Sequence, residues 1–154
     1  MDKTDIRILS EIQQDSSRSI AELGEIVGLS SSACHRRMRA LEEEGIIAGY
    51  GAYIDPAKAG IGVHALIEIT LENQSRACME RFEAAVQLYD DILECDLVSG
   101  EADYRLRVAA RTLADFEEIH RRCLSELPGV SAMHTSFVLR PVKRLRGYSL
   151  RSLR

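Results

Sequence analysis

The sequence lacks the features that mark several common classes of protein. It has no apolar run near the roughly 18 residues that a membrane-spanning helix needs, and residues 1–5 lead into a charged amphipathic segment rather than a signal peptide. A cytoplasmic protein without a membrane partner is therefore expected. It also has no Cys-x-x-Cys pair, and its four cysteines lie far apart. We expect buried free thiols, with no zinc cluster, no disulfide framework and no cofactor.

A basic excess is also missing. The formal net charge is −4, which opposes an extended DNA-binding surface, because duplex affinity comes largely from neutralising phosphates. Residues 1–60 hold seven Lys or Arg against ten Asp or Glu. Any nucleic-acid surface must therefore be a local cluster of basic residues, supported by oligomerisation.

The composition indicates a folded protein, and the pattern of residues divides it into two domains. Hydrophobic residues make up 45% of the 154 positions and charged residues 29%, which is typical of a globular chain. We assign residues 1–47 to a helix-turn-helix domain and 48–62 to a linker strand and hinge. Residues 63–142 form a sensing and oligomerisation domain, and 143–154 a basic tail.

Three short helices are predicted in the N-terminal domain. An acceptor at Asp2 opens the first, the capping box Ser19-Ile20-Ala21-Glu22 opens the second, and Gly28 ends it. Ser30 caps a third helix that runs from Ser31 to Glu44. Three short helices with such a turn are typical of a helix-turn-helix.

The third helix has two contrasting faces. Cys34, Met38 and Leu41 recur at helical spacing and predict a buried stripe. The opposite face carries hydroxyl and basic groups that suit phosphates and base edges. We predict that DNA is contacted by Ser31, Ser32, His35, Arg36 and Arg39. The alternative is that the arginines only pair with Glu42, Glu43 and Glu44 on a solvated helix.

Residues 46–54 have the composition of a strand, and Asp55-Pro56 marks a turn after it. We interpret this segment as a linker strand that could pair with a second subunit.

The C-terminal half predicts a βαββαβ order, which is a ferredoxin-like sandwich in an α+β protein. Strands are expected at residues 63–71, 92–98, 104–110 and 130–139, with helices at 76–88 and from 113. One face of the sheet remains uncovered, and we expect it to carry apolar residues such as Leu66, Cys95 and Met133. Such a face predicts a dimer joined through the sheets.

Several stretches together resemble the Lrp/AsnC family, the feast/famine regulators, over essentially the whole chain. The matching stretches include Val27-Gly28-Leu29-Ser30, Leu41-Glu42 with Gly45-Ile46-Ile47, Val98 to Tyr104, and Leu127-Pro128-Gly129-Val130. The resemblance implies a winged helix-turn-helix that binds double-stranded DNA, joined to a ferredoxin-like sensor domain. It further implies dimers that assemble to tetramers or octamers, with an amino-acid-like effector bound between sensor domains.

By this resemblance, residues 98–103 form the effector loop. Gly100 lets the backbone approach a ligand closely, exposed N–H groups can receive a carboxylate, and Asp103 can accept an ammonium group. Gly100 and Asp103 could instead serve only the turn. The implied effector-binding residues are Val98, Ser99, Gly100 and Asp103, with Thr135 from the last strand.

Two other functions compete with the regulator. Some tetrapyrrole decarboxylases resemble this family in fold and length, but the histidines are scattered over separate elements, with no nucleophile and base at motif spacing. A metal- or redox-responsive regulator would need clustered cysteines and histidines, and the sequence shows no local cluster. We therefore expect neither catalytic residues nor metal ligands.

The basic tail is either solvated or in contact with DNA or a subunit.

Overall fold

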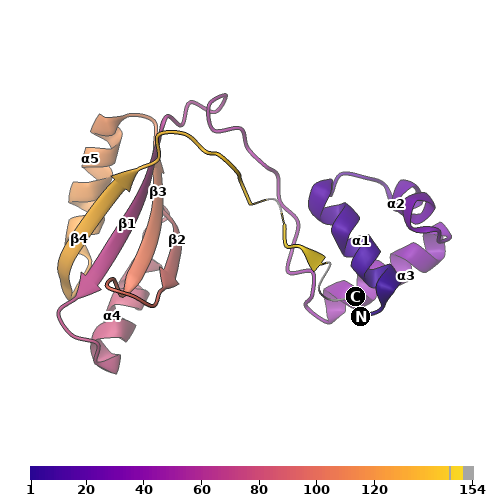
Figure 1. The fold of residues 1–154 in the computed structure, drawn as a ribbon, viewed down its shortest axis with the longest axis horizontal. Helices are drawn as coiled ribbons and strands as arrows, with labels where there is room; N and C mark the ends of the chain where they lie inside the picture. The colour runs from indigo at the N-terminus through magenta and orange to yellow at the C-terminus, as the bar shows by residue number, and fades with distance from the viewer. Residues whose placement is uncertain (146, 151–154) are drawn as a thin grey trace. The chain divides into compact units, whose positions relative to one another are not determined.

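The computed structural model describes residues 1–145 and 147–150, in two compact units (Figure 1). The helical unit comprises Met1–Tyr53 and the described residues from Val142 onward, and the sheet unit comprises Ile54–Pro141. The tail predicted as a separate basic segment thus groups with the N-terminal helices. The α+β class predicted from the sequence is confirmed.

The helical unit contains α1 (Lys3–Gln14), α2 (Ile20–Val27) and α3 (Ser31–Glu43). Local chemistry sets their ends as the sequence predicts. Asp2 and Ser19 each form a capping box with the residue three positions on, and Ser30 accepts a hydrogen bond from the Ala33 N–H. Their apolar faces form one small core, made of Ile8, Leu9, Leu23, Val27, Cys34, Met38 and Leu41.

The segment after α3 differs from its prediction. Residues 46–54 form no strand, and a turn at 56–60 follows, in which the Asp55 carboxylate accepts hydrogen bonds from the N–H groups of Ala57 and Lys58. A strand needs a neighbour to receive its backbone hydrogen bonds. The described part of this chain offers residues 46–54 no such neighbour, so the linker strand is not formed here.

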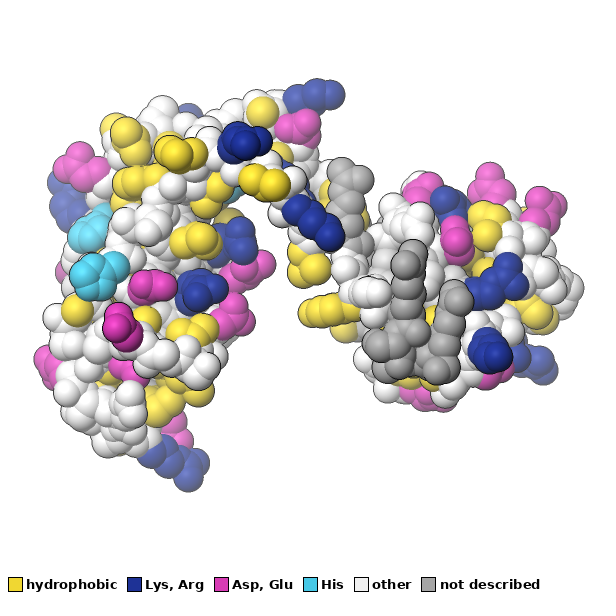
Figure 2. Space-filling view, in the orientation of Figure 1, with side chains coloured by type: hydrophobic (Ala, Val, Ile, Leu, Met, Phe, Trp, Pro, Cys, Tyr) yellow, Lys and Arg dark blue, Asp and Glu magenta, His cyan; other side chains and the backbone are white. Residues whose placement is uncertain are grey.

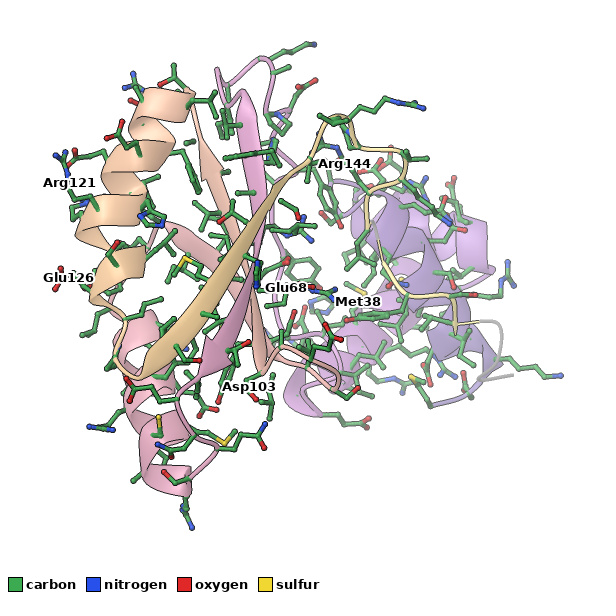
Figure 3. All side chains as sticks on the ribbon, turned by 60° about the vertical axis from the view of Figure 1, so that its left-hand side comes forward. Met38, Glu68, Asp103, Arg121, Glu126 and Arg144 are labelled. Atoms are coloured by element: carbon green, nitrogen blue, oxygen red, sulfur yellow. The ribbon has the colours of Figure 1, made fainter. Side chains whose placement is uncertain are left out.

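The sheet unit has the predicted βαββαβ order. It comprises β1 (Val63–Leu71), α4 (Arg76–Val86), β2 (Ile92–Leu97), β3 (Tyr104–Ala110), α5 (Leu113–Arg122), the short helix η1 (Leu124–Glu126) and β4 (Val130–Phe137). The four strands are antiparallel in the order β2-β3-β1-β4. Both helices cover one face of the sheet (Figure 3). Alternate residues of β1 and β3 are buried beneath them, as a half-covered sheet requires.

The strand register corrects the predicted composition of the uncovered face. Residues directly paired across an antiparallel ladder share a face. Met133 pairs with Ile69 and Cys95 pairs with Leu106, and both packed partners are fully buried. Met133 and Cys95 therefore pack against the helix-covered core, and only Leu66 of the three predicted residues lies on the other side.

We call the uncovered side the open face. Its residues follow from the register and are largely polar or charged, with Glu68 shown away from α5 in Figure 3. They are Glu94, Asp96, Arg105, Arg107, Ala109, His64, Leu66, Glu68, Thr70, Ala132, His134 and Ser136.

Candidate nucleic-acid interface and effector loop

Helix α3 presents the two faces that the sequence predicts. Cys34, Met38 and Leu41 are 0%, 7% and 3% exposed and pack against α1 and α2. The opposite side faces solvent, and every residue predicted to contact DNA is exposed, namely Ser31, Ser32, His35, Arg36 and Arg39. The helix thus offers a polar face of the size that a major groove admits.

The three arginines of α3 differ in their partners. Arg37 Nη1 lies 2.7 Å from both Asp2 Oδ2 and Asp5 Oδ1, which ties α3 to the start of α1. Arg36 and Arg39 form no ion pair within 4.0 Å with any described residue, so the alternative in which Glu42, Glu43 and Glu44 hold them is not seen. Two guanidinium groups thus remain available for an anionic partner.

The Asp2 carboxylate is held tightly in its charged form. Its hydrogen bond from the Asp5 N–H, followed by that from Arg37, lowers the pKa of Asp2 to about 2. The hydrogen bonds of Arg37 to the side chains of Asp5 and then Asp2 raise the pKa of Arg37. Arg37 is therefore a structural cation of the helical unit.

The turn between α2 and α3 is fixed by two glycines. Gly28 has φ +77°, a left-handed conformation that few other residues adopt. Gly24 is buried where the turn folds back, and a Cβ at this position would lie 2.8 Å from the Leu29 carbonyl oxygen. Gly24 thus allows the close approach that orients α3, a role that its position inside a helix did not reveal.

On the face shown in Figure 2, the basic residues form no continuous patch. Lys and Arg side chains alternate there with Asp and Glu over both units. This agrees with the net charge of −4. The short basic face of α3 is therefore the candidate surface for DNA contact.

The effector loop is a tight connection between β2 and β3. The Val98 N–H donates to the Asp103 carbonyl at 2.9 Å, and Gly100 has φ +134°, which requires glycine. Ser99 and Gly100 are exposed, whereas Asp103 is only 8% exposed. The loop can thus present backbone N–H groups at its tip while its base is packed.

The Asp103 carboxylate has internal partners. Oδ2 accepts from the Leu71 N–H at 2.8 Å and Oδ1 accepts from Gln74 Nε2 at 2.7 Å. These bonds tie the loop to the end of β1, in agreement with the alternative that Asp103 serves its own turn. The role of Asp103 toward an ammonium group stays a prediction. Such a group would have to bind the carboxylate lone pairs that Leu71 and Gln74 leave free.

Thr135 does not join the loop within one chain. It lies on β4 opposite Ile67, and β1 separates β4 from β3. Neighbouring strands are about 4.8 Å apart, so two strand spacings, about 10 Å, separate Thr135 from the strand that follows the loop. The register also places Thr135 on the helix-covered side with Ile67, so its role toward an effector stays a prediction.

Two residues that the sequence did not single out support the loop. Gln74 donates to Asp103, and Glu83 on α4 accepts a 2.7 Å hydrogen bond from the Tyr104 hydroxyl. Tyr104 is 1% exposed and stacks against Phe82 with ring centroids 4.6 Å apart. No sequence motif connects these residues, because each contact spans more than 20 positions.

The four cysteines are free thiols, and three of them are buried. Cys34, Cys78 and Cys123 are buried, and burial raises the pKa of the thiols of Cys95 and Cys123 to about 11. The thiolate is the metal-binding and nucleophilic form, and it is scarce at neutral pH with such values. Over residues 1–145 and 147–150, no three His, Cys, Asp or Glu residues are grouped to hold a metal ion.

Comparison with known families identifies a family for each part of the chain. Residues 1–48 match the winged helix-turn-helix DNA-binding family, and residues 64–148 match the Lrp/AsnC ligand binding domain. The chain belongs to the Lrp/AsnC family. It is a DNA-binding transcriptional regulator with a ligand-binding domain, and the decarboxylase alternative is set aside because the family is one of transcriptional regulators.

Curated relatives cover most of this Lrp/AsnC chain. The leucine-responsive regulatory protein of Haemophilus influenzae is 36% identical over 144 residues, which are 94% of this chain and 87% of that protein. An HTH-type transcriptional regulator of Sinorhizobium fredii is 46% identical over 116 residues, 75% of this chain and 91% of its own.

Solved structures of the family extend the likeness to the whole fold. A transcriptional regulator of Neisseria meningitidis in complex with L-Met superposes with a TM-score of 0.92 at 33% identity, covering 99% of both chains. Escherichia coli AsnC shares the fold, with a TM-score of 0.82 at 21% identity over 96% of this chain and 99% of its own. None of the described helices is long and apolar enough to cross a membrane.

Proposed function

We propose that this Lrp/AsnC regulator reads its operator with Arg36 and Arg39 of α3. The observation that supports this most is the difference among neighbouring arginines. Arg37 is held by Asp2 and Asp5, while Arg36 and Arg39 are exposed and form no ion pair within the described chain. Ser31, Ser32 and His35 lie at the exposed N-terminal end of the same helix and complete the proposed contact surface. Arginine binds phosphate oxygens and reads guanine edges with two hydrogen bonds.

A pair of matched substitutions tests the DNA contact. Arg36→Ala is expected to weaken operator binding by about 1–3 kcal/mol, the usual range for a lost base contact. Arg37→Ala removes the same charge from the adjacent position, and operator binding is expected to change far less because its guanidinium is already occupied. A gel-shift titration with a duplex selected from a random pool measures both. Equal losses would reject the assignment to Arg36.

We also propose that the effector is an L-α-amino acid, with L-methionine as the first candidate. The support is the exposed loop tip at Ser99 and Gly100 and the L-Met complex of the Neisseria meningitidis relative. Backbone N–H groups at Ser99 and Gly100 would receive the carboxylate, while the Val98 N–H donates to the Asp103 carbonyl and holds the base of the loop. Asp103 would complete the ammonium side.

Thermal-shift screening of the twenty amino acids tests this effector class. A ligand at 100 times its dissociation constant stabilises the folded state by about 2.7 kcal/mol. We expect L-methionine to raise the melting temperature of the wild-type chain and to have little effect on Gly100→Val, because a branched residue is strained at φ +134°. No shift with any amino acid would contradict the proposal.

The assembly that we propose is a homodimer joined through the open faces of two sheets. The open face has few apolar groups but carries both signs of charge, with Arg105 and Arg107 on β3 flanked by Glu68 on β1 and Asp96 on β2. A two-fold copy can therefore place arginines against carboxylates. In such a dimer two recognition helices would contact half-sites about 34 Å apart or a multiple of it.

Sedimentation measures this assembly and any tetramer or octamer built from it. Glu68→Lys on the open face is expected to weaken the dimer, whereas Glu117→Lys on the exposed surface of α5 serves as the control. An unchanged mass distribution for Glu68→Lys would contradict the sheet interface. We also propose that the regulator acts in the cytoplasm.

A further inference from the structure

The last described residues of the chain are built into the helical unit. The side chain of Gln13, at the end of α1, holds the backbone of Tyr148 on both sides. Tyr148 N–H donates to Gln13 Oε1 at 2.6 Å, and Gln13 Nε2 donates to the Tyr148 carbonyl at 3.3 Å. Figure 1 shows this segment, in yellow, beside the helices of the unit. A side-chain amide that hydrogen-bonds both backbone groups of one residue acts as a specific binding site for an extended segment.

The residues on either side of Tyr148 also pack against the helical unit. Leu150 packs against the core of the helical unit, together with Ile12 and Ile47. Gly147 has φ +134°, and a Cβ there would lie 2.6–2.9 Å from atoms of the Gln13 side chain. The segment therefore has an apolar anchor, a polar clasp and a glycine that permits the close approach.

A pocket of about 310 Å³ lies beside this segment in the helical unit. Tyr148 and Leu150 line it together with Leu9 and Ile12 of α1 and Tyr50 of the segment after α3. The C-terminal segment thus completes a surface that α1 and residues 46–53 leave open. A solvated tail would not supply a wall to a partly apolar pocket.

We propose that Gly147–Leu150 is a strap that docks within its own chain and ties the end of β4 to the DNA-binding unit. The chain passes between the two units twice, after Tyr53 and again before Val142. Only the nine residues 138–146 separate the end of β4 from Gly147. The strap therefore acts as a second covalent tether, and its few exposed hydrogen bonds make it a connection that can be released.

Hydrogen exchange of the full chain tests the strap. In the wild type the Tyr148 amide is expected to be protected, and Gln13→Ala should remove its acceptor and speed its exchange by about tenfold. The Val138 N–H, which donates to the His64 carbonyl at 2.9 Å just beyond β4, should also exchange roughly twofold faster once the tether is released. Gly147→Val is a second way to release the strap.

Gln14→Ala is the matched control, because Gln14 is exposed on the same turn of α1. It should leave both amides as in the wild type. An unprotected Tyr148 amide in the wild type, or equal rates in all variants, would overturn the strap. Faster Tyr148 exchange without any change at Val138 would overturn the tether. Protection that falls on dilution would show that the tail docks on a second copy and would overturn the intrachain assignment.

The strap does not depend on the proposed effector. Where L-methionine is the effector, Gln13→Ala should reduce the effector-dependent change in operator affinity while leaving L-methionine binding intact. A wild-type chain that ignores L-methionine would refute the effector, and the exchange rates would still decide the strap.

Discussion

The helical unit and the sheet unit are stabilised in different ways. The described core of the sheet unit contains sixteen buried residues held by three strand pairings, whereas that of the helical unit contains seven. The helical unit compensates with polar contacts at its helix ends, namely two capping boxes, the Arg37 cluster and an ion pair of Arg18 with Glu11. The comparison teaches that the DNA-binding unit is stabilised by polar contacts that each contribute little to its free energy of unfolding.

Because the two units are stabilised by different contacts, we predict that they unfold in separate transitions. A substitution in the core of one unit is expected to have the largest effect. Phe82 is fully buried in the sheet unit, and Phe82→Ala is expected to lower its free energy of unfolding by about 3–5 kcal/mol. Calorimetry of the full chain should show the sheet-unit transition move to lower temperature. Leu88→Ala, at an 80% exposed position, is the control. A single transition that moves as a whole would contradict the comparison.

A smaller effect is expected at the effector loop. Asp103→Ala leaves the Leu71 N–H and the Gln74 amide without their acceptor, which should cost the sheet unit about 2–3 kcal/mol. The response to effector should be lost, while DNA binding without effector stays nearly normal because α3 belongs to the other unit. Urea unfolding and gel shifts measure the two effects. A normal effector response would count against the loop as the effector site.

In the helical unit, Arg37→Ala should lower the melting temperature only slightly, because it breaks an exposed ion-pair cluster with Asp2 and Asp5. Only the transition of the helical unit should move in calorimetry. Arg39→Ala removes a neighbouring charge that has no ion pair among the described residues and should leave that transition in place. Equal shifts for the two variants would show that Arg37 is not structural.

The smallest expected effect is the loss of stability of the helical unit at low pH through protonation of Asp2. Because the pKa of Asp2 is lowered to about 2 from its usual value of 3.8, its contribution to folding is complete above pH 4 and is lost as the pH falls from about 4 through 2. Asp2→Asn keeps a capping side chain but cannot titrate, so the helical unit of this variant should lose less stability over that interval. Melting temperatures at pH 5, 4, 3 and 2 provide the measurement. Parallel curves would rule out Asp2 as a source of the pH dependence.

Elements set by local chemistry could be predicted from the sequence. Asp2, Ser19 and Gly28 carry their own capping signals, and the alternation in residues 63–71 fixes β1 and its buried face. The faces of the outer strands were harder. In β2 a register shift between Ile92 and Glu94 changes which residues face the helices, and the apolar alternation of β4 is too weak to identify its covered side.

Contacts between distant positions could not be predicted. Gln74 lies 29 positions from Asp103, and Gln13 lies 135 from Tyr148. Neither pair has a sequence pattern that joins its members. The exposed residues of α3 were predicted correctly, because helical periodicity assigns them to the face opposite Cys34 and Met38. The separate role of Arg37 depends on where α1 begins to pack, which periodicity does not contain.

The central claim is that α3 binds DNA and the loop at 98–103 binds the effector. Hydrogen exchange of the intact chain with each ligand in turn tests it most directly. A selected operator duplex should slow exchange in residues 31–39 and leave the loop at 98–103 unchanged, while L-methionine should slow exchange in the loop. Protection of the sheet unit by DNA, with residues 31–39 exchanging as fast as in the free chain, would contradict the assignment of DNA recognition to α3.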